Sequence, residues 1–145
     1  AQQLVELLAR VQSSHISPMK RIFLIFIIAF VLNLIWENLH SFLYDNYMGG
    51  KITELILLRA ALADAAIITV ITLPFLFYSF LKKRSWLIIF IGFVISVAIE
   101  YYALETGRWA YSVFMPIIPF LSTGLTPTIQ LGFLGYIAFK TEERI

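Results

Sequence analysis

The chain has 145 residues, of which 60% are hydrophobic and only 14% are charged, and its mean hydropathy is +0.85. A soluble domain carries about 25% charged residues, and one core of this size cannot hide so much apolar surface from water. The net charge of +2 is too small to indicate a nucleic-acid partner, and the lack of cysteine excludes disulfides and thiolate metal ligands. Composition therefore predicts an integral membrane protein.

Four segments are long and apolar enough to cross a bilayer as helices of roughly 20 residues. They are 21–44, 52–81, 85–104 and an irregular one within 113–139. The second is long enough to tilt or to protrude into the headgroups. No segment alternates apolar and polar residues as membrane strands do. We therefore predict an all-α fold, with a four-transmembrane-helix bundle in residues 19–145.

Basic residues predict the orientation of these spans. They gather before the first span, between the second and third, and after the fourth, at Lys20, Arg21, Lys82, Lys83, Arg84, Lys140 and Arg144. The other two connections hold only Lys51 and Arg108. Because cytoplasmic loops carry the excess of Lys and Arg, we expect both termini in the cytoplasm, and the membrane to be a prokaryotic cytoplasmic membrane.

Residues 1–18 differ from the rest of the chain. Leu4, Leu7, Leu8 and Val11 form an apolar stripe at helical spacing, and a polar stretch, 12–18, follows them. We interpret this part as an amphipathic helix and linker. It is either an added segment, since Met19 has the form of a natural start, or a native surface helix.

Polar and ionisable side chains inside spans are costly, so each marks a candidate functional site. In the first span Asn33, Glu37, His40 and Tyr44 follow at spacings of four, three and four, which places them on one face of a helix. The predicted orientation places nearly all polar residues of the spans in the outer half of the bilayer, while the inner half is aliphatic or aromatic. We therefore expect one polar cavity that opens toward the outer side.

Structural interpretations compete with functional ones at these positions. An ion pair of Arg59 with Glu37 or Glu100 is as reasonable as a role for Arg59 in binding a substrate. The spacing of Glu37 and His40, three residues apart, also occurs in carboxylate–imidazole metal pairs. However, an imidazole near the end of a span is more typical of an interfacial hydrogen-bonding residue, so we expect no metal and no cofactor.

Carboxyls outnumber basic groups in this predicted cavity. Glu37, Asp64 and Glu100 face only Arg59 and the imidazole of His40. An unpaired carboxylate in surroundings of low dielectric constant tends to take up a proton. We therefore expect one of the three carboxyls to be a neutral proton donor at pH 7.

The fourth span is predicted to be broken. Prolines 116, 119 and 127 and Gly124 cannot all lie inside one regular helix. Thr126 followed by Pro127 has the form of a helix N-cap and first residue. We expect a short re-entrant or interfacial element over 113–121, a turn, and a helix that begins near Pro127; one kinked span is the alternative.

Residues 100–130 contain an acidic residue, then T-G-R-W-A-Y, prolines, and G-L-T-P-T-I-Q-L. This stretch resembles the hallmark region of small integral membrane carotenoid enzymes, the lycopene cyclase domains and related carotenoid hydratases. The matching positions are Glu100, Gly107, Trp109, Tyr111 and Pro127. The cyclases carry paired glutamates after the proline, where this chain has Thr-Ile-Gln at 128–130. An ordinary aromatic belt at the membrane interface is the competing interpretation of Trp109 and Tyr111.

We predict a protein that binds or modifies an isoprenoid or other membrane lipid. If it is an enzyme of isomerase, cyclase or hydratase type, its acid–base residues are Glu100, Asp64 and Glu37. The predicted substrate-binding residues are Arg59, His40, Asn33, Trp109, Tyr111, Thr126 and Gln130. The alternatives are an oligomeric proton- or cation-coupled transporter or channel, and an accessory subunit of a larger membrane complex. A homodimer is compatible with each of them.

Overall fold

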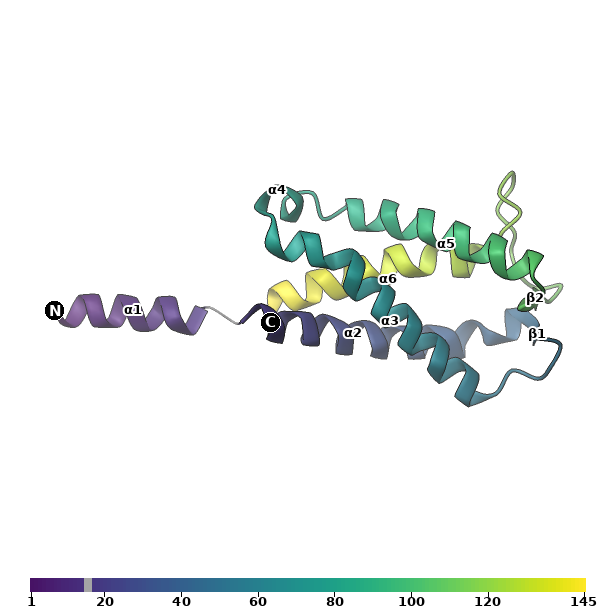
Figure 1. Ribbon diagram of the computed structural model, residues 1–145, viewed down its shortest axis with the longest axis horizontal. Helices are drawn as coiled ribbons and strands as arrows, with labels where there is room; N and C mark the ends of the chain where they lie inside the picture. The colour runs from purple at the N-terminus through teal and green to yellow at the C-terminus, as the bar shows by residue number, and fades with distance from the viewer. Residues whose placement is uncertain (15–16) are drawn as a thin grey trace.

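The computed structural model describes residues 1–14 and 17–145, so His15 and Ile16 of the predicted linker, and the side chain of Val11, lie outside the described residues. The elements in chain order are α1 (Gln2–Ser14), α2 (Pro18–His40), the short 3-10 helix η1 (Ser41–Leu43), β1 (Tyr44–Tyr47), α3 (Glu54–Phe77), α4 (Ser79–Lys82), α5 (Leu87–Glu105), β2 (Trp109–Tyr111) and α6 (Leu125–Arg144). Helices α2, α3, α5 and α6 pack into one elongated helical body, with β1 and β2 at one end (Figure 1). We call this end the sheet end.

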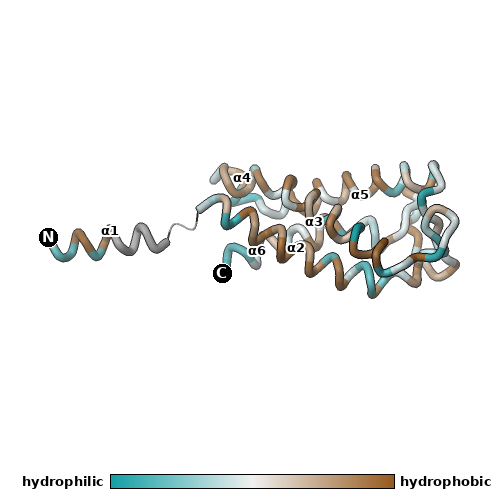
Figure 2. The backbone as a smooth tube through the Cα atoms, turned by 60° about the horizontal axis from the view of Figure 1, so that its bottom comes forward, coloured by the Kyte–Doolittle hydropathy of each residue, from teal (hydrophilic) through white to brown (hydrophobic). Residues whose placement is uncertain are grey.

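Within the described residues, three helices are long and apolar enough to cross a membrane. They are α2 with η1 (Pro18–Leu43), α3 and α5. Hydrophobic residues recur along all three helices (Figure 2). Their outward faces are apolar as well, since Phe23, Val31, Val70, Phe90 and Val94 are all exposed. Helices that are apolar on every side are typical of buried or membrane-spanning segments. The fourth predicted span, in α6, is not among the three.

The ends of α2 differ from the predicted span 21–44. The helix begins earlier, at Pro18, because the Ser17 hydroxyl accepts a hydrogen bond from the Lys20 N–H at 3.3 Å and Pro18 occupies the first helical position. It ends earlier, at His40, and Tyr44 already belongs to β1.

The predicted second span, 52–81, is two helices in the structure. Thr53 caps the start of α3, and its hydroxyl accepts from the Ile56 N–H at 3.4 Å. Pro74, inside the last turn of α3, cannot donate a backbone hydrogen bond. The helix ends at Phe77, and the short α4 follows.

The segment before α6 contains turns and no helix. An isolated bridge joins Ile117 to Gly124, and the loop projects sideways from the helical body (Figure 1). A helix does begin near Pro127, but the predicted N-cap, Thr126, is wrong, because Gly124 is the N-cap and α6 begins at Leu125. Pro127 fits within the first turn because the first N–H groups of a helix have no intrahelical partner. Thr126 does not cap the helix, and its hydroxyl contacts the imidazole of His40 instead.

The prediction of a purely α-helical chain missed a small antiparallel sheet. In it Tyr44 pairs with Tyr111 and Tyr47 with Trp109, with an irregular register after Tyr44. Gly107, at φ +72°, allows the chain to turn back after α5. The sheet joins the connection between α2 and α3 to the connection between α5 and α6, and it covers the end of the helical body.

Apolar and polar residues occupy opposite halves of the helical body. The half away from the sheet is a core of aliphatic and aromatic side chains, including Ile25, Ile68, Phe75, Ile88 and Phe139. At this end Arg21 and the buried Glu142 form a two-bonded ion pair, at 2.6 and 2.9 Å, which joins the start of α2 to the end of α6. Most polar side chains of the spans lie in the half nearer the sheet, while Thr69 and Thr72 of α3 lie beside the apolar core.

Helices α5 and α6 approach each other most closely at two glycines. A Cβ on Gly92 would overlap the backbone of Gly132, and a Cβ on Gly132 would overlap the carbonyl of Ile89. The backbone, unlike a side chain, cannot rotate away. This contact fixes how deeply α6 lies in the helical body.

We predict that Gly92→Ala or Gly132→Ala lowers the free energy of unfolding by roughly 1–3 kcal/mol, because overpacking pushes the two helices apart. The measurement is unfolding by SDS titration in mixed micelles. Gly135→Ala is the matched control, because its Cβ would meet side-chain atoms of Ile88 and Ile68, the nearest at 3.3 Å, and not the backbone of a neighbouring helix. Unchanged stability in both variants would contradict the assigned helix contact.

Candidate functional site

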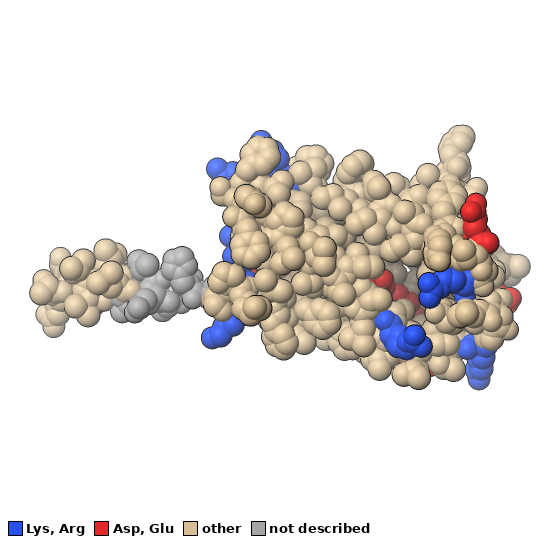
Figure 3. All heavy atoms as spheres, viewed as in Figure 1, with Lys and Arg blue, Asp and Glu red and all other residues tan. Residues whose placement is uncertain are grey.

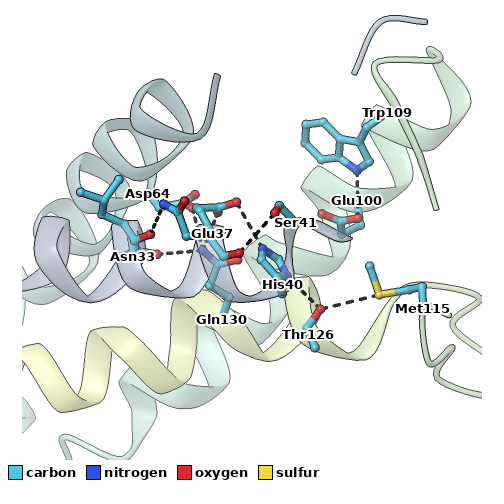
Figure 4. Close-up of polar contacts among 12 residues, drawn as sticks. Asn33, Glu37, His40, Ser41, Asp64, Glu100, Trp109, Met115, Thr126 and Gln130 are labelled. Atoms are coloured by element: carbon cyan, nitrogen blue, oxygen red, sulfur yellow. Dashed lines mark hydrogen bonds and ion pairs between the residues drawn. The ribbon is translucent and has the colours of Figure 1, made fainter. Parts of the chain in front are cut away.

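The polar side chains of four helices converge in the sheet half of the body (Figure 4). The predicted common face of α2 is confirmed for Asn33, Glu37 and His40, which all turn toward α6. Asp64 comes from α3 and Glu100 from α5. The contacts below show that these residues form two hydrogen-bonded groups beside one cavity.

The first group centres on Gln130 of α6, and we call it the Gln130 cluster: Asn33, Glu37, Asp64 and Gln130. The side-chain nitrogen of Gln130 lies 2.9 Å from Asn33 Oδ1, 2.8 Å from Glu37 Oε1 and 2.9 Å from Asp64 Oδ2. The Asn33 amide in turn donates to the Ala29 carbonyl at 2.7 Å. An amide nitrogen carries two hydrogens, so three oxygens compete for two donors.

His40 extends this cluster toward the sheet. Its Nε2 lies 3.2 Å from Glu37 Oε2, and its Nδ1 lies 2.9 Å from the Thr126 hydroxyl. The edge of the buried imidazole meets Tyr44, with ring centroids 5.4 Å apart. The ring thus connects a carboxyl of α2 to the first turn of α6. Among the described residues, no three His, Cys, Asp or Glu side chains are placed to hold a metal ion.

The second group centres on Glu100, of which only 4% is exposed. Glu100 Oε2 accepts a hydrogen bond from Trp109 Nε1 at 3.1 Å and another from the Tyr111 hydroxyl. The Tyr111 oxygen accepts from the Gly124 N–H at 3.0 Å. The polar atoms of Trp109 and Tyr111 therefore point inward, to a carboxyl.

Burial raises the pKa of the Tyr111 phenol above its usual value, and the hydrogen bond to Glu100 raises it further. Burial also raises the pKa of Tyr44 well above the usual range, with Glu100 as the next largest cause. Both phenols are therefore neutral hydrogen-bond donors throughout the physiological pH range.

A cavity of about 340 Å³ lies beside the two groups. It is bounded by α3 and α5, because α3 packs on α2, α5 packs on α6, and α3 diverges from α5 toward the sheet end (Figure 1). Figure 3 shows the hollow in the side of the molecule, with acidic atoms inside it and basic side chains at its rim. The charged residues that line it are Glu37, Asp64, Glu100, Arg59 and Arg108.

Arg59 lines the cavity and makes no ion pair with a described carboxylate, so of the two alternatives for this residue the pair with Glu37 or Glu100 is not formed. Glu37 is bonded instead to Gln130 and His40, and Glu100 accepts hydrogen bonds from Trp109 and Tyr111. The Arg59 side chain is exposed, as is that of Arg108. Arg108 was absent from the predicted site because its position depends on the pairing of β1 with β2, which connects segments far apart in sequence.

Ser96 is another cavity residue that the predicted site lacked. Only 2% of this residue is exposed, and its hydroxyl has no hydrogen-bond partner among the described residues. It lines the cavity from α5, one helical turn before Glu100. Because buried hydroxyls are nearly always hydrogen-bonded, this free hydroxyl indicates a place for a polar ligand atom.

No family model, no curated protein and no solved structure matches the chain. The function must therefore be argued from the cavity. Three carboxyls, a free hydroxyl and two arginines can bind a polar group, and the carboxyls can exchange protons with it.

We predict that Gln130→Met, which keeps the shape and removes the donors, costs roughly 1–3 kcal/mol of stability per oxygen left without a partner. Gln130→Glu should cost more above neutral pH, because it adds a further acid to the cluster. SDS-titration unfolding at two pH values measures both variants, with the neighbouring, exposed Ile129→Leu as control. A Met variant as stable as the wild type would show that Gln130 does not hold the cluster together.

Proposed function

We propose that the chain is an integral membrane protein of four crossing helices that binds the polar end of an isoprenoid or other lipid in the cavity between α3 and α5. In this proposal both termini face the cytoplasm, and the sheet end lies at the outer surface. The observation that carries it is the position of the cavity: polar inside, and open on the apolar flank of the molecule rather than at its end.

The proposal includes α6 as the fourth crossing helix. It packs against α2, α3 and α5, and many of its residues are buried, including Leu131, Leu134, Ala138 and Phe139. A helix covered by three others needs less apolar surface than one that faces lipid. Its charged residues gather in the last turns, at the end where the basic residues of the other connections also lie.

The side opening suits an amphiphile. A ligand that enters between α3 and α5 keeps its apolar tail in the bilayer while its polar end reaches the carboxyls. The cavity volume of about 340 Å³ falls at the lower end of the range for small-molecule sites. It would hold a headgroup or the end of a chain, and not a whole lipid.

The chemistry that these residues favour is proton transfer to a double bond or a headgroup, with Glu100, Asp64 or Glu37 as acid or base. Of the residues that resemble the carotenoid-enzyme motif, Trp109 and Tyr111 both donate a hydrogen bond to Glu100. At the position of the paired glutamates, however, this chain has Gln130, which binds two carboxyls from other helices. Any polyene chemistry would therefore use different acids.

Transport is less well supported. A carrier or channel needs a polar route to both sides of the membrane, and the half of the helical body away from the sheet is filled by an apolar core. The cavity therefore gives access to the polar residues from one side only, and not through the half that holds the apolar core.

Filling the cavity tests the proposal. Ala63 lines it, and Ala66, on the same helix, is exposed and does not. We predict that Ala63→Phe lowers the amount of a defined lipid that co-purifies in mild detergent by several-fold, because the ring occupies the headgroup space, and that Ala66→Phe does not. Extraction and mass spectrometry measure this. Equal retention of the same bulk lipids by wild type and both variants would contradict the lipid site and favour ion-flux assays in liposomes.

A further inference from the structure

We propose that the ligand of this cavity is a zwitterionic lipid whose ammonium group binds among the carboxyls and whose phosphate binds Arg59 and Arg108. A phosphoethanolamine headgroup has this chemistry. The inference rests on the lipid site proposed above and names the class of its ligand. It depends on how charge, free hydrogen-bonding capacity and aromatic surface are distributed within the cavity.

The inner wall is suited to a cation. All three carboxyls of the site line the cavity, and the two arginines lie at its exposed rim. Glu37 and Asp64 share the single side-chain nitrogen of Gln130, which leaves lone pairs on their oxygens unused. An ammonium group supplies three donors, and the Ser96 hydroxyl, which has no described partner, offers a further acceptor.

Aromatic rings complete this wall. Tyr44, Tyr47 and Trp109 line the same cavity. Trp109 lies edge-on to Tyr44, with centroids 6.2 Å apart, and is stacked with Tyr47 at 6.4 Å. Ring faces attract ammonium groups, and aromatic cages combined with carboxylates are a common way to bind them.

The rim is suited to an anion. Arg59 comes from α3 and Arg108 from the turn after α5, so they reach the cavity from two different elements. Neither forms an ion pair with a described carboxylate. Guanidinium groups bind phosphate oxygens in paired hydrogen bonds. Arg59 precedes Asp64 by five residues, about 7 Å along a helix, so the positive and negative sites are separated as in a dipolar headgroup.

This order of charges excludes two other headgroup types. A purely anionic headgroup would meet the carboxyls if it entered fully, and a neutral one would leave both arginines without a partner. The tail would leave between α3 and α5, past the apolar lining residues Ile56, Ile67 and Ile99.

The test titrates the delipidated full-length protein with dioleoylphosphatidylethanolamine, dioleoylphosphatidylglycerol and dioleoylglycerol, which share their tails, and follows binding by native mass spectrometry. We expect the ethanolamine lipid to bind about tenfold or more tightly than the other two. Asp64→Asn should remove this preference without weakening the binding of dioleoylphosphatidylglycerol. Arg59→Gln should weaken the binding of both phospholipids and leave the binding of dioleoylglycerol unchanged. Glu105→Gln and Arg144→Gln, at exposed positions that do not line the cavity, are the controls.

Ser96→Ala separates ligand binding from folding. Because the hydroxyl has no described partner, its removal should leave stability unchanged and weaken the ethanolamine lipid several-fold. Equal affinity for all three lipids, or preference for the glycerol phospholipid, would overturn the zwitterion proposal and leave the lipid site intact. If Ala63→Phe binds all three lipids as well as the wild type does, the site itself is wrong.

Discussion

The arrangement of the site depends on holding several carboxyls inside an apolar helical body. Gln130 does this by offering one amide nitrogen to oxygens of α2 and α3 at once. The position of Gln130 is set by Gly132, two residues further along α6. Gly132 contacts Gly92 of α5 with no side chain between the two helices. A wider separation of α5 and α6 would withdraw Gln130 and leave Glu37 and Asp64 without their common donor, which is costly in surroundings of low dielectric constant.

The cavity is a consequence of the same packing. Helix α6 packs beside α2 and α5. Helix α3 packs along α2 and diverges from α5 toward the sheet end. Several side chains at this divergence are small, among them Ala60, Ala63 and Ser96. The sheet of β1 and β2 covers the end of the body, so the opening remains on the side. In the proposed function, the ligand site exists because α3 and α5, rather than another pair of helices, diverge.

The parts of the fold that depend on local pattern could be predicted from the sequence. Spacing alone placed Asn33, Glu37 and His40 on one face, and the apolar runs of α2, α3 and α5 were evident. Non-local features could not be predicted. The pairing of Tyr44 with Tyr111 connects segments too short to show a strand pattern, and it positions Arg108. Counting charges left open whether Arg59 pairs with a carboxylate, because it ignores the hydrogen bonds that Glu100 and Glu37 accept from Trp109, Tyr111 and Gln130.

The central claim is that a water-accessible cavity opens between α3 and α5, on the apolar flank of the protein and in the outer half of the membrane. The chain has no cysteine, so single cysteines test it directly in sealed, oriented vesicles. At Ala63, which lines the cavity, a cysteine should react with a charged, membrane-impermeant maleimide added outside. At Ala66, which is exposed and does not line it, a cysteine should react only with a lipid-soluble reagent. Reaction of Ala63→Cys only from the inside, or equal behaviour of the two positions, would contradict the account.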